Sequence, residues 1–279
     1  MKTVQNLLVP FMVFISISIT SAQSEDSTNT RVKDQYRWER FSVNLGVFLN
    51  TMNNDLQLGS SKGFGVTVNL ENALGLTTST FVMRGKTEYN FGKKRRSSLR
   101  LGFVSMTRNA SKTLEGEITI GDYVYKKGIT IKSSFGFTII RAVYDYAFYQ
   151  DNRARIGLTG GFFAMPVNFS IEYLDIQTAK FVAPLPVIGL RSSFQITPKV
   201  TLKQSAELFY IKILGYTGSI SDINFVVDYK ILDHFGVGLG LNSFKLNVEA
   251  TQDSRLLGEI NGTVKSGVSG VMLFARYFF

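Results

Sequence analysis

Apolar and polar side chains alternate along most of the chain after residue 22. In residues 222–231 the odd positions are Ile, Phe, Val, Tyr and Ile, and the even positions are Asp, Asn, Val, Asp and Lys. Residues 82–91 show the same split, with Arg84, Lys86 and Glu88 opposite an apolar face. Successive side chains of a strand point to opposite faces of the sheet. The pattern therefore predicts an all-β chain.

The length of the alternating segments separates a soluble sandwich from a membrane barrel. Residues 130–149 and 260–279 alternate over stretches much longer than the roughly 5 or 6 residues of strands in soluble proteins. A tilted membrane-spanning strand needs about 9 to 11 residues. Aromatic residues also gather near the expected strand ends, as in a membrane-interface girdle. We therefore expect a transmembrane antiparallel up-and-down β-barrel.

Residues 1–22 match a secretory signal peptide. Lys2 precedes an apolar stretch from Leu7 to Ile19, and small residues follow up to Ala22, the expected cleavage site. An N-terminal membrane anchor is the alternative, but a spanning helix needs about 20 apolar residues. The polar residues 23–37 are expected to form a periplasmic lead-in. This leaves 38–279 as the barrel domain, in the outer membrane of a Gram-negative cell.

The last residues form an apolar face that stops on an aromatic side chain. Val271, Leu273, Ala275, Tyr277 and Phe279 alternate with more polar positions. This ending resembles the C-terminal signature of Gram-negative outer-membrane barrels, whose closing strand is read by the barrel-assembly machinery. The resemblance implies that Tyr277 and Phe279 are an assembly signal, and that outer-membrane lipids are partners. A soluble edge strand ending this way by chance is the alternative.

Short polar turns alternate with longer connections and so give the strand count. Short turns are expected at Gly92–Ser97, Gln150–Arg153, Thr197–Lys199 and Asp233–His234. Four short periplasmic turns and five outer loops require ten strands, with both termini in the periplasm. The expected strands are 38–50, 78–91, 98–108, 130–149, 154–172, 182–196, 200–213, 218–232, 235–250 and 260–279.

Two of the outer loops contain alternating pieces of their own, Gly65–Glu71 and Glu117–Tyr125. We interpret them as strand extensions above the bilayer. Counting them as spans would give twelve strands, the alternative, and would place the turn at Gly92–Ser97 outside.

Three segments carry a resemblance that covers most of the mature chain. They are Glu71–Leu76, Leu185–Arg191 and Asp233–Gly240. The chain is similar in these segments to a family of poorly characterised Gram-negative outer-membrane β-barrel proteins. The resemblance implies the fold and the location, and it brings no catalytic residues.

The composition restricts the chemistry. The chain has 31 Lys and Arg against 21 Asp and Glu, a net charge of +10, one His and no Cys. Thiolate metal sites are excluded, and no metal site or cofactor is expected. Export argues against nucleic acid as the partner of the basic surface. A lipid-modifying enzyme would need a base beside its nucleophile, and His234 falls in a periplasmic turn instead.

Alternation along each strand assigns a set of charged side chains to the barrel interior. A packed, paired polar core with a structural or envelope role is one interpretation. A narrow, porin-like channel for small anionic solutes is the other, since ten of these groups are basic and five acidic. The oligomeric state is left open. The lumen candidates are Arg40, Arg84, Lys86, Glu88, Arg100, Arg141, Asp145, Arg155, Arg191, Lys203, Glu207, Asp222, Asp228, Lys230 and Arg276.

Overall fold

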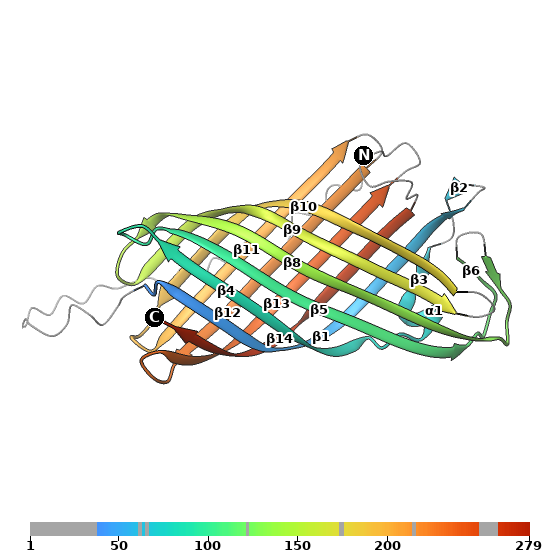
Figure 1. The fold of residues 1–279 in the computed structure, drawn as a ribbon, viewed down its shortest axis with the longest axis horizontal. Coiled ribbons are helices and arrows are strands. Elements are labelled where there is room, and N and C mark those ends of the chain that lie inside the picture. The colour runs from blue at the N-terminus through green and yellow to red at the C-terminus, as the bar shows by residue number, and fades with distance from the viewer. Residues whose placement is uncertain are drawn as a thin grey trace, which may run out of the picture. The chain divides into compact units, whose positions relative to one another are not determined.

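Ten long strands dominate the computed structural model, which describes residues 38–60, 63–64, 67–120, 123–172, 176–213, 216–250 and 262–279 (Figure 1). The expected signal peptide and lead-in lie outside the described residues. The long strands are β1 (Phe41–Ser60), β4 (Ser79–Phe91), β5 (Ser97–Thr113), β8 (Thr130–Gln150), β9 (Ala154–Glu172), β10 (Ile176–Gln195), β11 (Val200–Ile213), β12 (Tyr216–Lys230), β13 (Phe235–Ala250) and β14 (Gly262–Phe278).

The ten strands form one closed ring. Each long strand pairs antiparallel with the next long strand in the chain, and β14 pairs with β1. The closing register runs from Ser42 opposite Phe278 to Leu58 opposite Gly262. The prediction of ten strands is therefore confirmed, and the four expected short turns all join neighbouring strands. We call the end of the barrel with these turns the periplasmic end, since periplasmic turns of such barrels are short.

Several strands are longer at the outer end than the sequence indicated. Strand β1 continues to Ser60 rather than residue 50, β5 continues to Thr113, and β10 begins at Ile176. The pattern marks the membrane-crossing part of each strand well. It fades above the bilayer, where neither face has to be apolar.

The two outer loops are not simple strand extensions, so that interpretation was wrong. Residues 67–78 include the short strand β3 (Val68–Asn69), which pairs with β1, and the helix α1 (Leu70–Leu74). Residues 63–64 form β2 (Gly63–Phe64), also paired with β1. The other loop forms a separate hairpin of β6 (Ile118–Ile120) and β7 (Tyr123–Tyr125).

Helix α1 is short and well capped. The side chain of Asn69 accepts a hydrogen bond from the backbone N–H of Asn72 at 3.0 Å. Gly75 ends the helix with a φ of 73°, a left-handed conformation that glycine adopts without strain. The side chains of Leu70 and Leu74 are fully buried. No helix in the described ranges is long and apolar enough to cross a membrane.

The outer surface of the barrel carries the apolar face of every strand. Phe81, Met83, Phe162 and Ile188 each expose more than 60% of their surface. Contiguous exposed apolar surface of this kind is unstable in water and indicates contact with lipid. Exposed aromatic side chains gather toward the periplasmic ends of the strands: Tyr89, Phe91, Tyr144, Tyr146, Phe148, Tyr149, Tyr229, Phe235, Tyr277 and Phe279. They match the aromatic girdle expected from the sequence.

The interior of the barrel has two different halves. Toward the outer end the inward side chains are apolar and pack around α1, and we call this part the apolar plug. Toward the periplasmic end they are charged. The apolar plug includes the buried side chains of Leu56, Leu70, Leu74, Met106, Ile131, Phe135, Phe137, Phe163, Met165, Phe169, Ile171, Leu185, Phe244 and Leu246.

The arrangement of turns and loops predicts which sites an external reagent reaches. The chain has no Cys, so a single introduced thiol reports its own position. Glu115 is exposed at the outer end and Lys94 is exposed in the turn between β4 and β5. On intact cells an impermeant thiol reagent is expected to label Glu115→Cys and to spare Lys94→Cys until the outer membrane is permeabilised. The reverse pattern would contradict the orientation.

Candidate functional site: an ionic layer and a central cavity

The charged half of the interior forms a single layer of contacting side chains. Strand alternation brings them inward from eight of the ten long strands, all except β1 and β13, and we call them the ionic layer. Its members are Arg84, Lys86, Glu88, Arg100, Arg141, Asp145, Arg155, Arg191, Lys203, Glu207, Asp222, Asp228 and Arg276. The layer thus has eight basic and five acidic side chains.

Arg100 of β5 is the centre of the largest cluster in the ionic layer. Its Nε and Nη2 donate to both carboxylate oxygens of Asp145 at 2.6 and 2.7 Å, a bidentate pair. Nη2 also donates to Glu207 Oε1 on β11 at 2.9 Å and to Thr159 Oγ1 at 2.8 Å. Arg191 then joins Asp145 to Glu88 on β4, with its Nη2 2.7 Å from Glu88 Oε2. These contacts tie strands on opposite sides of the lumen together.

A second cluster connects β8 with β12. Arg141 Nη1 lies 2.9 Å from Asp222 Oδ2, and the other carboxylate oxygen accepts hydrogen bonds from Asn224 and Asn242. The aliphatic stem of Arg141 lies flat against Gly102, where an added Cβ would sit 2.6 Å from Cγ. The guanidinium carbon of Arg141 also stands 4.9 Å from the centroid of the Phe163 ring. Arg141 therefore forms the boundary between the ionic layer and the apolar plug.

A third cluster lies nearest the periplasmic end. Asp228 accepts from Lys203 Nζ, and Arg276 Nη1 lies 3.2 Å from the same carboxylate. Arg276 Nη2 donates to Glu39 Oε2 at 2.9 Å, just before β1 begins. The guanidinium carbon of Arg276 is 5.0 Å from the ring centroid of Phe278. This cluster fastens the last strand to the first.

Three basic side chains of the ionic layer lack a close acidic partner among the described residues. Arg84 donates only to the thioether of Met272, at 3.0 Å. Lys86 Nζ is 3.9 Å from Glu88, beyond hydrogen-bond distance. Arg155 donates to Asn90 Oδ1 at 2.7 Å and to the carbonyl of Arg96 at 3.2 Å. The ionic layer therefore carries positive charge that its own carboxylates do not compensate.

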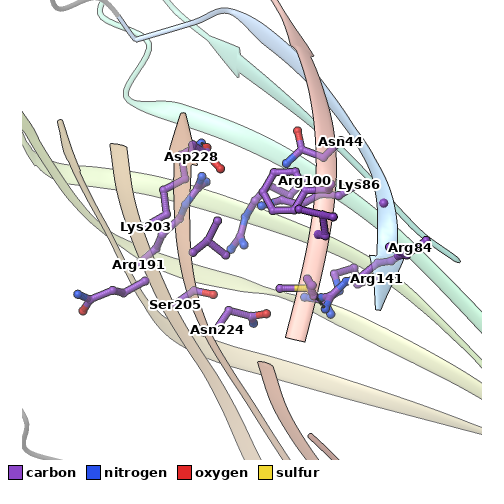
Figure 2. Close-up of a pocket in the computed structure, with 17 residues that line it drawn as sticks. Asn44, Arg84, Lys86, Arg100, Arg141, Arg191, Lys203, Ser205, Asn224 and Asp228 are labelled. Carbon is purple, nitrogen blue, oxygen red and sulfur yellow. Dashed lines mark hydrogen bonds and ion pairs between the residues drawn. The ribbon is translucent and has the colours of Figure 1, made fainter. Parts of the chain in front are cut away.

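A cavity of about 70 Å³ lies within the ionic layer. Figure 2 shows Arg84, Lys86 and Arg141 on one side of it, and Lys203 and Ser205 on the other. The charged residues that line it are Arg84, Lys86, Arg100, Arg141, Arg191, Lys203 and Asp228, six bases and one acid. The cavity thus lies where the uncompensated charge gathers.

The structure places nearly all lumen candidates in the interior, but two of them lie at its rim. Lys230 is 39% exposed and contacts Asp233 at 3.1 Å in the turn after β12. Arg40 is exposed, because β1 begins only at Phe41, and it lies outside the ionic layer. Arg40 instead borders a surface hollow of about 370 Å³ with Trp38, Lys93, Lys94, Arg95, Arg96, Gln150, Asp151 and Asn152.

The turns around this hollow are held by hydrogen bonds. Trp38 Nε1 donates to the carbonyl of Asp151 at 2.9 Å, and Gln150 Nε2 donates to that of Lys94 at 2.7 Å. The carboxylate of Asp151 accepts from the backbone N–H of Ala154 at 2.6 Å. Partial burial raises the pKa of Asp151. The hydrogen bonds that its carboxylate accepts, from Ala154 and others, lower the pKa by more, so it lies below the ordinary value.

Sequence reasoning missed a buried ion pair in the apolar plug. Glu71 of α1 accepts from Arg108 Nη1 at 2.7 Å and from Asn54, through both its backbone N–H and its side chain, at 2.8 Å. Glu71 was expected at the end of a strand extension, Gly65–Glu71, in an outer loop. The sequence does contain a signal for helix α1, because Asn69 and Gly75 are typical N-cap and C-cap residues.

Two features of the described residues bear on metal binding and catalysis. No group of three or more His, Asp or Glu side chains gathers there as metal ligands would. Nδ1 of the single His234 lies 3.0 Å from the carbonyl oxygen of Phe278, and its ring is 6.3 Å from that of Tyr277. His234 is thus engaged by the last strand at the periplasmic end.

Comparison with solved structures shows the class of this fold. The outer membrane protease OmpT from Escherichia coli superposes with a TM-score of 0.55 at 10% identity, over 86% of this chain and 96% of that one. Ail of Yersinia pestis (TM-score 0.37, 12% identity, 86% and 97% covered) and OprG of Pseudomonas aeruginosa (0.36, 13%, 88% and 98%) also match. No family model matches the chain, and no curated protein matches it.

The chain therefore has the fold of a Gram-negative outer-membrane β-barrel protein. At this level of identity the likeness to OmpT concerns the fold alone. The exposed apolar surface and the aromatic girdle independently require a lipid bilayer. Together they place the ten-stranded barrel in the outer membrane.

The Arg100 cluster predicts a large effect of removing one buried carboxylate. Glu207 is fully buried, and Glu207→Ala leaves Arg100 with one partner fewer in the interior. Breaking a buried ion pair in this way costs about 3 to 5 kcal/mol. Unfolding in urea, followed by Trp fluorescence in detergent, is expected to shift to lower concentration. Glu115→Ala, at an exposed position, is the control and should shift nothing; an unchanged Glu207→Ala midpoint would contradict the prediction.

Proposed function

We propose that the protein is a non-conducting barrel with a structural role in the outer membrane. The proposal rests on one observation, the apolar plug that fills the outer half of the interior around α1. Water and ions enter an apolar, close-packed interior only at a high free-energy cost. A continuous aqueous path through the barrel would have to cross this region.

The ionic layer supports the same role. Its bidentate and cross-lumen pairs join β5 to β11, β8 to β12 and β10 to β4. Charge-assisted pairs of this kind are the stronger hydrogen bonds of a protein, and these cross the lumen. The barrel would then serve as a stable anchor, and the hairpin β6–β7 at the outer end is the part that it would hold above the membrane. Outer-membrane lipids would contact the exposed apolar surface of the strands, and the C-terminal strand would engage the assembly machinery.

A narrow channel for small anionic solutes is the second candidate. The excess of basic side chains around the central cavity favours it. It would require α1 and its apolar neighbours to move out of the lumen. A lipid-modifying enzyme has less support, because His234 is hydrogen-bonded at the periplasmic end.

Single-channel recording tests the proposed role. Purified protein in a planar bilayer is expected to stay silent. Replacing residues 67–76 by a Gly-Ser linker of equal length removes α1 and is expected to produce openings. A matched replacement of residues 115–117 in the outer loop, which leaves the plug intact, should remain silent. Stepwise, anion-selective openings of the unmodified protein would overturn the proposal in favour of the channel.

A further inference from the structure

The central cavity carries an imbalance that packing does not explain. Six basic side chains and one acidic side chain line it. Arg100, Arg141, Arg191 and Lys203 are each held by a carboxylate within 3 Å. The remaining positive charge belongs to the two bases of β4, Arg84 and Lys86.

Arg84 and Lys86 point the same way because they are two residues apart on one strand. A guanidinium has five N–H donors and an ammonium has three. Arg84 uses one donor, on a weak thioether acceptor, and Lys86 has no hydrogen bond among the described residues. The side chain of Lys86 is 30% accessible although it lies within the barrel, because it faces the cavity. Several strong donors are therefore directed at empty space.

Neutral polar side chains around the cavity are also available. Asn44 is opposite Lys86 in the β1–β4 register, and its Oδ1 is buried without a hydrogen-bond partner. The NH₂ group of the same amide is a hydrogen-bond donor. Ser205 of β11 lines the other wall with a hydroxyl that forms no hydrogen bond in the described structure. Donors thus converge from both sides of the lumen (Figure 2).

We propose that the cavity binds a small tetrahedral oxyanion of the phosphate or sulfate class. A positive charge inside the lumen is costly when its counter-charge is absent, as for Arg84, or distant and shared, as Glu88 is for Lys86. An anion between Arg84 and Lys86 removes that cost. The fork of a guanidinium matches two oxygens of such an anion, while the ammonium contacts a third. A cavity of about 70 Å³ suits a compact inorganic oxyanion better than a phosphate ester that carries a glycerol group.

The site does not depend on the proposed structural role. If the barrel does not conduct in single-channel recordings, the binding measurement still shows whether its cavity takes up an anion. A conducting barrel would refute the structural role and leave the binding measurement valid.

Equilibrium dialysis of radiolabelled inorganic phosphate tests the site. The intact protein, purified from membranes in a maltoside detergent, is used at constant ionic strength set with sodium chloride. We expect saturable binding of one phosphate per barrel. Unlabelled sulfate is expected to compete, and glycerol 3-phosphate is expected to compete at least tenfold more weakly, because its glycerol group adds bulk. Effective competition by glycerol 3-phosphate would overturn the enclosed site and indicate a lipid headgroup.

Two charge-matched double variants locate the site. Arg84→Gln with Lys86→Gln is expected to weaken phosphate binding at least tenfold. Lys93→Gln with Lys94→Gln removes the same charge from the exposed periplasmic turn and should bind as the unmodified protein does. Equal loss in both variants would overturn the cavity as the site.

Stability separates a binding role from a merely structural one. Without phosphate, Arg84→Gln is expected to unfold at the same or higher urea concentration, because an uncompensated buried charge is gone. With phosphate, the unmodified protein should gain stability and the variants of Arg84 and Lys86 should not, as a ligand bound to the folded state requires. If the double variant fails to fold, Lys86→Met alone is measured in the same way. Absence of saturable binding to the unmodified protein overturns the proposal whatever the variants do.

Discussion

The pairing of β1 with β14 is the constraint on which the rest of the structure depends. In hydrocarbon no water replaces a missing partner, so every backbone N–H and C=O of the sheet has to be bonded within the protein. The long register from Ser42–Phe278 to Leu58–Gly262 closes the ring and removes both sheet edges. Closure at ten strands then fixes the width of the lumen, and that space has to be filled.

The two halves of the interior solve this problem with different chemistry. At the periplasmic end, long Arg and Lys side chains reach across the lumen and meet carboxylates on the opposite wall. At the outer end, wall side chains such as Phe135 and Phe163 leave a gap, which α1 fills with Leu70 and Leu74. The helix enters with one carboxylate, Glu71, and that charge is neutralised by Arg108. The same rule of paired burial therefore governs both halves.

The alternation of side chains was sufficient to predict the number of strands, the short turns and most of the inward charged positions, with Arg40 and Lys230 as the exceptions. The alternation is clear wherever one face of a strand contacts lipid, as at Phe81 and Met83. The sequence did not reveal the plug, because in the outer part of β8 the apolar side chains Ile131, Phe135 and Ile139 point inward and alternate with more polar outward residues. Alternation alone does not say which of the two faces is the inner one. A helix of five residues is also too short to show a helical period. Contacts such as Arg191 with Glu88 depend on lumen width, which no local pattern contains.

Cross-lumen ion pairs also specify the register of the barrel. A shift of one residue would turn every inward charge toward lipid, so each pair penalises the misaligned sheet. If the charges served only to specify the register, equal numbers of basic and acidic side chains would be expected. The ionic layer departs from this balance at Arg84 and Lys86, which line the cavity together with the paired side chains. The departure costs stability in the empty barrel, and a bound anion removes the cost, so the imbalance is better explained by a ligand than by folding.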